Sequence, residues 1–461
     1  MTRLCPRHGA RQGRAPIAML GRHRPWGLPT LPARAAITPA WCARILPGQR
    51  DGDIAPYRHY SREWRPAPLA PARPRWLSDK SPSMYFSRAT RARAPAVAHR
   101  RPLEPVDESK GETYTSAPSL FPLPFTPMSK QFSVAVAGAT GAVGVEMIRM
   151  LEQRNFPVSS LKLLASARSV GKKMTFRGEE IAVEEMTEKS FKGVDIALFS
   201  AGGDVSKKFR NAVVDAGCVM IDNSSAFRME EDVPLVVPEV NPEDVRWHKG
   251  VIANPNCSTI IMLVPVAPLH RAFGLKRLVA ATYQAASGAG AKGMNELLTQ
   301  TRDVLDGKPA VRKAFVDQIA FNVFPHIDVF KDNGYTKEEL KMVNETRKML
   351  HTDDIRITCT CVRVPVQRAH SESLNLEFEK SATPDQVREI LSKAPGVIVV
   401  DDPANNRYPV PIEAAGHGEV LAGRIRQDIS LPDNKGIDLF VAGDQLLKGA
   451  AYNAVQIAEL L

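Results

Sequence analysis

The feature that most constrains this chain is the glycine-rich turn Gly138-Ala-Thr-Gly141-Ala-Val-Gly144, which follows an apolar run at 132–137 and precedes a helical pattern at 145–151. A strand, a glycine-rich turn and a helix in this order form the context that a dinucleotide-binding site requires. We expect Gly138 to allow the tight turn, Gly141 to let backbone amides approach a pyrophosphate, and Gly144 to permit close packing of helix on strand. The spacing is GxxGxxG rather than GxGxxG, and glycine-rich turns also close ordinary βα units. The prediction of a dinucleotide site therefore depends on the position of this turn directly after the first strand.

Strands alternate with helical patterns in the next hundred residues. Apolar runs at 161–165, 194–200 and 218–222 are separated by helix-compatible segments. This order predicts a Rossmann-type, doubly wound parallel sheet, whose ligands bind beyond the carboxyl ends of the strands. Arg228 follows the strand at 218–222, so it is expected either to hold an anion there or to cap the acidic turn at 230–232.

The residues after the second predicted strand favour NADP(H) over NAD. An NAD-binding chain usually offers an acidic residue to the ribose 2′-hydroxyl at this point. This chain instead has Arg168 and Ser169, with Lys172 and Lys173 close behind. A cation and hydroxyl groups suit a 2′-phosphate. The alternative is a solvated basic turn.

Residues 1–127 differ in composition from the rest of the chain. They hold 21 of the 61 Lys and Arg but 8 of the 50 Asp and Glu, and 20 of the 36 prolines, so the net charge of +11 arises there. With no sustained apolar period, this segment is predicted to be a disordered, basic extension. It could be a targeting segment, which would place the protein in an organelle, or a nucleic-acid-binding arm. We favour a third interpretation, that translation begins at Met128 and that the protein is cytoplasmic.

The cysteines and the hydropathy exclude several classes of protein. No run of 18 apolar residues is present, so a membrane span is not expected. The six cysteines lack the spacing of a disulfide framework, which indicates a reducing compartment. Cys359 and Cys361 alternate along a strand-like run and should lie on one face of a sheet. No further His or Cys stands at ligand spacing, so no metal site is predicted.

Cys257 is the candidate nucleophile. It stands in the sequence Asn254-Pro-Asn-Cys-Ser-Thr259, directly before an apolar run that is compatible with a helix. A cysteine in the first turn of a helix can be stabilised as a thiolate, which lowers its pKa from about 8.5 to roughly 3.5–7.5. The alternative is a buried cysteine that packs as a small hydrophobe.

Three polar residues further along the chain are candidate partners of Cys257. Gln284 lies in an apolar strand at 278–286 and needs a hydrogen-bond partner, which could be a substrate group or the backbone. Arg363 ends a strand before Pro365, and a guanidinium binds a carboxylate or phosphate with two hydrogen bonds. His370 lies in the turn that follows, and histidine is the natural acid–base group near neutral pH. Together with a cofactor fingerprint, this set indicates an active site.

A helix is predicted at 336–350. Thr336 is its N-cap, and Glu339 completes a capping box. Glu338 and Lys341 share a face three residues apart, which on pattern alone predicts a surface ion pair. The chain ends with a strand at 439–442 and an amphipathic helix at 446–460, which should pack back on the first domain.

Six ordered motifs resemble bacterial-type aspartate-semialdehyde dehydrogenases from about residue 131 to the end. They are GATGAVG (138–144), NSSAFRM (223–229), NPNCST (254–259), YQAASGAG (283–290), RVPVQRAHSES (363–373) and AGDQLLKGAAYNAVQIAE (442–459). The resemblance implies reversible reductive dephosphorylation of β-aspartyl phosphate to aspartate β-semialdehyde with NADPH, on the route to lysine, threonine and methionine. The nearest alternative enzyme is an N-acetyl-γ-glutamyl-phosphate reductase, which Asn256 and Gln284 disfavour. A rival of another class is an NADP-binding sensor without turnover.

The resemblance also implies roles for individual residues. Cys257 would carry the acyl group as a thioester, and His370 would be the general acid–base. Asn256 and Gln284 would bind the substrate, and Gln284 would orient its acyl group. Arg363 would bind the substrate carboxylate, and Glu338 would support the amine. Arg228 and Lys341 would hold the phosphate. Cofactor-binding residues would be Gly138, Thr140, Gly141, Ala142, Val143, Gly144, Arg168, Ser169, Ser287, Gly288 and Gln445.

The expected organisation has two folded domains after residues 1–127. Residues 130–257 would form the NADP-binding domain, completed by the C-terminal helix within 443–461. Residues 258–442 would form an α+β domain that binds substrate and mediates a homodimer, as the resemblance implies. The expected partners are therefore a small-molecule substrate, phosphate and a second copy of the chain, with no nucleic acid and no membrane.

Overall fold

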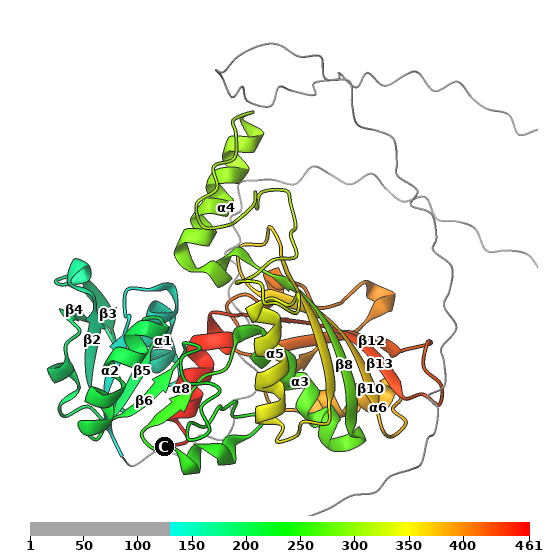
Figure 1. Cartoon of the computed structure of the whole chain (residues 1–461), viewed down its shortest axis with the longest axis horizontal. Coiled ribbons are helices and arrows are strands. Elements are labelled where there is room, and N and C mark those ends of the chain that lie inside the picture. The colour runs from blue at the N-terminus through cyan, green and yellow to red at the C-terminus, as the bar shows by residue number, and fades with distance from the viewer. Residues whose placement is uncertain (1–129) are drawn as a thin grey trace, which may run out of the picture. The chain divides into compact units, whose positions relative to one another are not determined.

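The computed structural model describes residues 130–461, so the predictions for residues 1–127 lie outside the described part of the chain. Two sheets organise the described residues (Figure 1). The strands of the first are β1 (Phe132–Ala137), β2 (Val158–Ala165), β3 (Lys173–Phe176), β4 (Glu179–Glu185), β5 (Ile196–Phe199), β6 (Val219–Asp222) and β7 (Val251–Ala253). Those of the second are β8 (Leu275–Gln284), β9 (Arg356–Arg363), β10 (His370–Phe378), β11 (Val397–Val399), β12 (Val420–Gln427) and β13 (Gly436–Gly443).

The first sheet has the predicted doubly wound form. Its order is β3-β4-β2-β1-β5-β6-β7, and all neighbouring strands are parallel except β3, which pairs antiparallel with β4. Alternate residues of β1 enter different cores: Val134 and Val136 pack with α1 (Ala142–Gln153) and α8 (Tyr452–Ala458), whereas Ala135 and Ala137 face the core of α2 (Gly203–Asp215). A sheet buried on both faces explains why its strands are continuous apolar runs.

The glycine turn packs as its spacing predicts. Gly138 has a φ of +87°, and a Cβ there would overlap the carbonyl of Ser200 at the end of β5. A Cβ at Gly144 would overlap the carbonyl oxygen of Gly138, so α1 can lie against the end of β1 only because both residues are glycine. The turn therefore packs closely against the carboxyl ends of the strands, where a ligand is expected.

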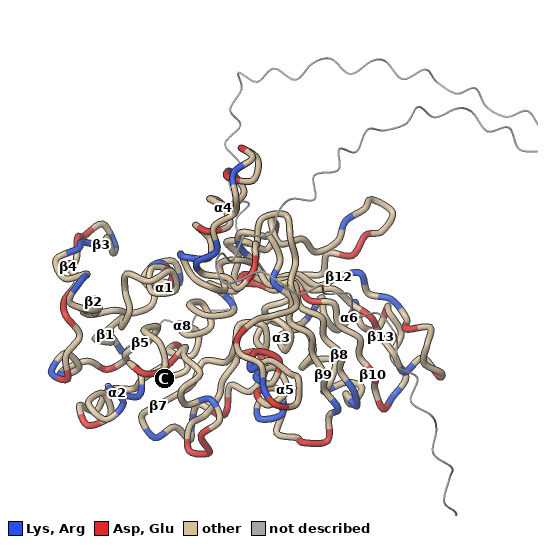
Figure 2. The backbone as a smooth tube through the Cα atoms, turned by 45° about the horizontal axis from the view of Figure 1, so that its top comes forward, with Lys and Arg blue, Asp and Glu red and all other residues tan. Residues whose placement is uncertain are grey.

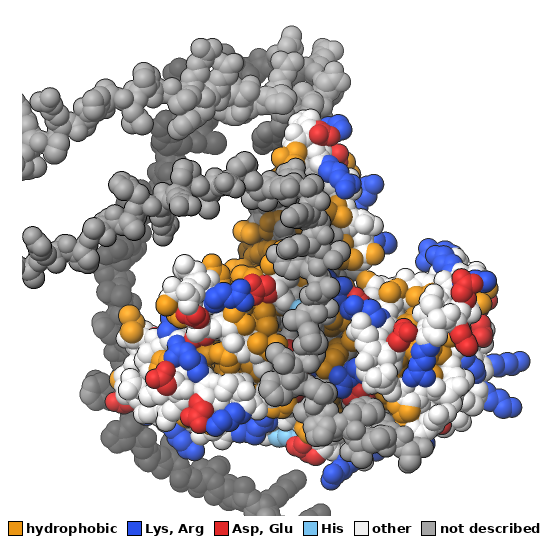
Figure 3. Space-filling view, turned by 180° about the vertical axis from the view of Figure 1, so that it is seen from behind, with side chains coloured by type: hydrophobic (Ala, Val, Ile, Leu, Met, Phe, Trp, Pro, Cys, Tyr) orange, Lys and Arg blue, Asp and Glu red, His pale blue; other side chains and the backbone are white. Residues whose placement is uncertain are grey.

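The second sheet has the order β11-β12-β13-β10-β8-β9 and is mixed. One face is covered by α3 (Cys257–Phe273), α5 (Lys337–Met349) and α6 (Pro384–Lys393), which contact one another and the strands. On the opposite face, Tyr283 lies beside Phe440, with ring centroids 6.0 Å apart. No described helix covers the part of this face that lies over β8 and β10, and Figure 3 shows hydrophobic side chains exposed on this side of the molecule.

Two further helices lie outside these layers. The helix α4 (Gly290–Leu305) follows the 3-10 turn at Ala286–Ala289 and stands away from the second sheet (Figure 1). The short helix α7 (Pro411–Ala414) contacts β13.

The C-terminal segment packs back on the first sheet, as predicted, but it is not an amphipathic α-helix. It begins with a π-helical turn at Leu447–Ala451, which continues into α8. Nearly every residue from 445 to 458 is buried, because the segment lies between α1, α3 and the strands β5 and β6. The apolar periodicity correctly indicated a helix. The polar face that it predicted to be exposed is buried.

Charged residues of both signs are interspersed along the described backbone (Figure 2), which agrees with the near-neutral balance of this part of the sequence. None of the described helices is long and apolar enough to cross a membrane. Cys359 and Cys361 lie on the same buried face of β9, as predicted. No cluster of metal-ligating side chains occurs among the described residues.

Candidate active site

A cavity of about 330 Å³ joins the glycine turn to Cys257. Residues from both sheet regions line it, and the lining residues include nine of the predicted site residues: Gly141, Ala142, Val143, Arg228, Asn256, Cys257, Ser287, Gly288 and Gln445. A larger surface groove of about 570 Å³ runs beside α5, lined by residues such as Trp247 and His351. None of the predicted site residues lines that groove, so the smaller cavity is the candidate site.

Cys257 is the first residue of α3, as predicted. Asn256 is the N-cap, and its Oδ1 accepts hydrogen bonds from the backbone amides of Ser258 at 3.0 Å and Thr259 at 3.3 Å. This cap fixes the first turn of the helix and satisfies two of its free amides. Cys257 is half-buried and lines the cavity, while the hydrophobic residues that follow it enter the core. The alternative of a sealed structural cysteine therefore does not fit this position.

Cys257 does not have the low pKa that its position at a helix N-terminus predicts. Burial, with the nearby Glu338 carboxylate, raises the pKa of the thiol to about 12, although Arg228, Lys341 and Arg363 act in the opposite direction. Desolvation opposes the charged form of any group, and here it exceeds what the nearby cations provide. The sequence indicated that Cys257 begins a helix, which would lower its pKa. It did not indicate how closely other residues pack around the sulfur, which raises the pKa.

Three neighbouring strands bring Gln284, Arg363 and His370 together. Gln284 and Arg363 are paired in register at the ends of β8 and β9, and His370 is the first residue of β10 rather than part of the turn. All three are buried, and along their strands they alternate onto the face that packs against α3 and α5. The period of two residues in a strand thus places all three side chains at one edge and on one face of the sheet.

His370 is held in one orientation. Its Nδ1 accepts a hydrogen bond from the backbone amide of Ala285 at 3.0 Å, and its Nε2 has no hydrogen-bond partner within residues 130–461. Burial, with a smaller effect of Arg363, holds the pKa of the imidazole well below its ordinary value of 6.5. The neutral ring with its proton on Nε2 is therefore the form that satisfies these contacts.

Gly288, which lines the cavity, packs directly against the side chains of His370 and Arg363. A Cβ at this position would lie 2.8 Å from Nη1 of Arg363 and 3.2 Å from Nε2 of His370. Arg363 also donates from Nη1 to the carbonyl oxygen of Ala285 at 2.6 Å. A residue larger than glycine would thus be pushed against both side chains.

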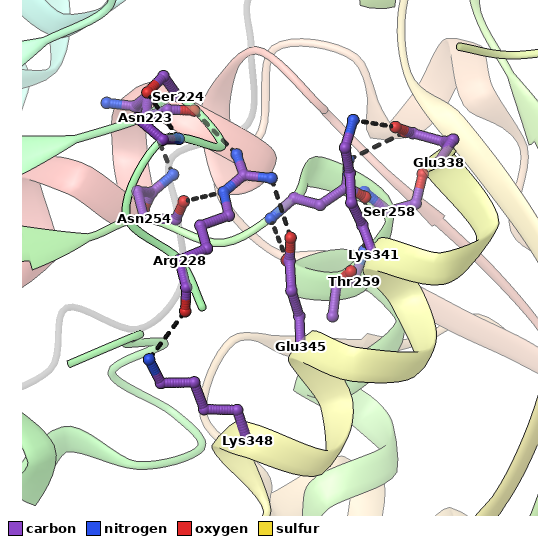
Figure 4. Close-up of polar contacts among 12 residues, drawn as sticks. Asn223, Ser224, Arg228, Asn254, Ser258, Thr259, Glu338, Lys341, Glu345 and Lys348 are labelled. Carbon is purple, nitrogen blue, oxygen red and sulfur yellow. Dashed lines mark hydrogen bonds and ion pairs between the residues drawn. The ribbon is translucent and has the colours of Figure 1, made fainter. Parts of the chain in front are cut away.

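Glu338 and Lys341 do not form the surface ion pair that the pattern predicted. Glu338 is only 5% exposed, and its carboxylate accepts hydrogen bonds from Asn256 at 2.9 Å and Gln284 at 3.2 Å. It also accepts one from Lys341 at 2.9 Å (Figure 4). Burial would raise the pKa of this carboxyl, but Lys341 and the hydrogen bonds outweigh it and lower the pKa. The helix α5 places this pair against the start of α3, a tertiary contact that helical spacing does not reveal.

Arg228 does not cap the acidic turn at 230–232. Its guanidinium donates to the carbonyl oxygens of Asn254 at 2.9 Å and Asn223 at 2.8 Å, and to Glu345 at 3.0 Å. Arg210 pairs with the acidic turn instead, through Glu230. The three bonds of Arg228 use three of the five N–H groups of a guanidinium, so two remain for a ligand in the cavity.

The expected cofactor-binding residues lie in two groups. Backbone positions 141–143 line the cavity, and Gln445 donates a hydrogen bond to Ser287, which also lines it. Away from the cavity, the hydroxyls of Thr140 and Ser169 lie 3.3 Å apart, and Arg168 is exposed in the 3-10 turn Ala167–Ser169. Lys173 is engaged by Glu180 across the β3–β4 pair.

Sequence reasoning missed Glu345. It lies two helical turns beyond Glu338 on α5 and is 1% exposed, with one oxygen facing Arg228 and the other accepting from the backbone amide of Asn256 at 2.6 Å. The spacing of seven residues between the two glutamates was a signal that both lie on one face of the helix. It did not show that this face is buried against the site.

Comparison with known proteins agrees with this arrangement. Residues 133–248 match the family model of the semialdehyde dehydrogenase NAD-binding domain, and residues 266–448 match that of the semialdehyde dehydrogenase dimerisation domain. The aspartate-semialdehyde dehydrogenase of Aquifex aeolicus is 55% identical over 335 residues, which cover 72% of this chain and 98% of that protein. The chain belongs to the aspartate-semialdehyde dehydrogenase family.

Solved structures of aspartate-semialdehyde dehydrogenases are also similar. A crystal structure of aspartate semialdehyde dehydrogenase II from Vibrio cholerae, complexed with ASA, has a TM-score of 0.70 and 48% identity, and the match covers 72% of this chain and 98% of that one. An aspartate semialdehyde dehydrogenase from Candida albicans, solved with NADP, has a TM-score of 0.55 and 26% identity, and the match covers 72% and 98%.

These matches confirm the aspartate-semialdehyde dehydrogenase family, the nucleotide-binding Rossmann-type fold and the oxidoreductase class that the motifs indicated. The expected homodimer agrees with the match to the dimerisation domain. The division of the chain near residue 257, the preference for NADP and the roles of single residues stay predictions.

Proposed function

We propose that this protein is an NADP-dependent enzyme that converts β-aspartyl phosphate and aspartate β-semialdehyde into one another, within amino-acid biosynthesis that leads to lysine, threonine and methionine. The observation that carries the proposal is the single cavity that holds both the glycine turn and Cys257. A nucleophile and a dinucleotide site in one cavity suit a reaction that first forms an acyl-enzyme and then reduces it.

The proposed reaction begins with Cys257. Its sulfur attacks the acyl carbon of β-aspartyl phosphate, the bond from that carbon to the phosphate oxygen breaks, and the phosphate leaves with the thiol proton as the thioester forms. NADPH held at the glycine turn would supply a hydride to the acyl carbon. The oxygen at that carbon would take a proton and lose it again as the C–S bond breaks, and the proton would pass to the sulfur as the aldehyde and the thiol separate. His370 is proposed to exchange that proton through Nε2, the ring atom without a partner among the described residues.

The remaining residues are proposed to hold the substrate. Arg363 would bind its carboxylate and Glu338 its amine, while Gln284 and Asn256 would orient the acyl group. Arg228 and Lys341 would hold the phosphate, since Arg228 lines the cavity with two unused donors and Lys341 lies beside Glu338. Arg228, Lys341 and Arg363 act to lower the pKa of Cys257, the direction that a nucleophilic sulfur requires, although burial raises it overall.

The NADP preference rests on the second group of cofactor residues. Arg168 is exposed beside Ser169, where a ribose 2′-phosphate would be recognised. The close packing of Gly138 and Gly144 gives the backbone turn that a pyrophosphate requires. Replacement of Arg168 by Ala should raise the KM for NADP but not for NAD, and Lys173→Ala, which removes a cation already paired with Glu180, is the control.

The homodimer is proposed to form through the second sheet. The face of this sheet opposite α3 is covered by α7 only near Ala442. The apolar residues on or beside this face are Tyr283, Phe440, Tyr408, Pro409 and Val410. Burial of such a face in an isologous contact is the usual outcome for an apolar surface of this kind.

The function is tested by assaying the purified full-length protein with NADP and phosphate on aspartate β-semialdehyde and on N-acetyl-glutamate γ-semialdehyde. We expect turnover of the first and at least a hundredfold lower kcat/KM for the second. The reverse order would make the protein an N-acetyl-γ-glutamyl-phosphate reductase, and cofactor binding without turnover of either would make it a sensor.

A further inference from the structure

Glu345 uses both of its carboxylate oxygens at the candidate site, as Glu338 does, but its partners are Arg228 and the backbone that precedes Cys257. Oε1 accepts a hydrogen bond from Nη1 of Arg228 at 3.0 Å, and Oε2 accepts one from the backbone amide of Asn256 at 2.6 Å. Figure 4 shows the side chain reaching from α5 toward Arg228. One carboxylate thus joins the cation that lines the cavity to the residue that caps α3 and precedes Cys257.

We propose that Glu345 is a positioning residue that fixes Arg228 relative to the first turn of α3, and therefore relative to the sulfur of Cys257. The inference rests on the proposed function, in which Arg228 holds the phosphate group of the acyl phosphate that Cys257 attacks. Displacement at the acyl carbon needs the nucleophile and the leaving group in place at the same moment. A misplacement of about 1 Å between them can cost roughly a hundredfold in rate.

The three residues come from separate parts of the chain. Arg228 lies in the segment after β6, Asn256 directly precedes α3, and Glu345 lies on the third turn of α5. Lys348, one turn further along α5, donates to the backbone carbonyls of residues 228, 230 and 233 and so holds the Arg228 segment against the same helix. The helix α5 is therefore the element through which the segment that carries Arg228 is aligned with the start of α3.

A glutamine at position 345 would test the carboxylate without changing the shape of the side chain. A carboxylate accepts hydrogen bonds at both oxygens, whereas a carboxamide accepts at one end and donates at the other. Whichever way the amide of Glu345→Gln turns, either Arg228 or the amide of Asn256 would face another donor. One of the two contacts is thus lost, and a buried donor is left unsatisfied.

Glu339 offers a matched control on the same helix. It is buried, and its carboxylate accepts hydrogen bonds from two backbone amides, those of Thr336 at 2.7 Å and Cys361 at 3.0 Å. It contacts none of the proposed substrate-binding side chains. Glu339→Gln therefore makes the same change of charge and removes a comparable contact, but away from Arg228 and Cys257.

The experiment measures steady-state kinetics in the direction that consumes aspartate β-semialdehyde, NADP and phosphate, together with the melting temperature, for the wild type and both variants. For Glu345→Gln we expect a KM for phosphate about tenfold higher and a kcat about tenfold lower, with a KM for NADP within about twofold of wild type. Glu339→Gln should lower the melting temperature and leave the KM for phosphate unchanged. Glu345→Asp keeps the charge but cannot reach both donors, so it should raise the KM for phosphate as well.

The inference is overturned if Glu345→Gln and Glu345→Asp leave the KM for phosphate unchanged while the wild type is active. It is also overturned if the KM for phosphate falls, because Glu345 would then weaken anion binding by its charge rather than position Arg228. A wild-type protein without activity on these substrates would instead refute the proposed function, so the two failures are distinguishable.

Discussion

The backbone amide of Ala285 donates a hydrogen bond to Nδ1 of His370 at 3.0 Å. This contact connects the residue after β8 to the first residue of β10, and it settles which ring nitrogen carries the proton. Nε2 is left free next to Gly288, which lines the cavity. A side chain that is fully buried thus presents one polar atom toward the candidate site.

Replacement of His370 by Asn should keep the contact with Ala285 but remove the group at Nε2. The amide oxygen of Asn can accept from the Ala285 amide, so the fold should be retained. We expect kcat to fall by roughly 10²–10⁴, the usual contribution of a general acid–base group, while the KM for NADP changes little. Steady-state kinetics and the melting temperature together check this, and a variant with nearly normal kcat would exclude His370 as the proton-exchanging group.

Replacement of Cys257 by Ala should abolish turnover and preserve cofactor binding. The side chain forms the proposed thioester, whereas the residues of the glycine turn that line the cavity do not depend on it. Isothermal titration with NADPH should give a Kd within about threefold of wild type. Ordinary activity in this variant would show that the thioester mechanism is wrong.

The raised pKa of Cys257 predicts how its alkylation depends on pH. With a pKa of about 12, the thiolate fraction of the ligand-free protein should rise about tenfold per pH unit between pH 7 and 10. The rate of reaction with iodoacetamide should therefore rise without a plateau in this range, and substrate should protect the residue. Cys257→Ser supplies the background from the other cysteines. A plateau below pH 8 would mean that the helix N-terminus and the nearby cations outweigh burial.

Replacement of Arg363 by Ala should weaken substrate capture more than it slows the chemistry. A charged hydrogen-bond pair contributes about 1.5–3 kcal/mol, so the KM for aspartate β-semialdehyde should rise roughly 10- to 150-fold. Arg356 begins the same strand and is exposed, with Glu377 as its partner. Arg356→Ala is therefore the control and should leave the KM unchanged, and an equal effect of the two variants would contradict the role of Arg363.

Replacement of Glu372 should increase the stability of the protein at high pH. Glu372 is fully buried, and neither carboxyl oxygen has a hydrogen-bond partner in the part of the chain that the structure describes. Burial raises its pKa well above the ordinary value of 4.5. Because the folded protein keeps a proton that the unfolded chain releases above pH 4.5, the free energy of unfolding falls as the pH rises. Glu372→Gln should remove this loss and raise the free energy of unfolding at pH 8 by about 1–3 kcal/mol, but not at pH 4.

Thermal unfolding of the wild type and of Glu372→Gln at pH 4 and pH 8 checks this prediction. If Glu372→Gln destabilised the protein equally at both pH values, the buried carboxyl would not be the cause of the loss.

Much of the first domain could be predicted because local sequence determines it. The glycine turn, its flanking strand and helix, and the alternation of strands and helices are each encoded within a few residues, and all were confirmed. The position of Cys257 after an N-cap was predictable for the same reason.

The environment of the site was harder to predict, because it is made by contacts between segments far apart in the chain. The spacing of Glu338 and Lys341 indicated a shared helix face, but their burial depends on how α5 packs on α3. The pKa of Cys257 depends likewise on the density of protein around the sulfur. Glu345 was missed because its two partners lie 89 and 117 residues away.

The π-helical turn at Leu447–Ala451 has a consequence for the order in which the protein matures. Gln445, Leu446, Gly449 and Ala450 supply one wall of the cavity whose opposite wall is the turn at 141–143. A ribosome makes the glycine turn about three hundred residues before it makes this wall. The growing chain thus stays without a complete catalytic pocket until residue 450 has been synthesised and has folded back onto α1, so a nascent chain stalled before this point should be inactive.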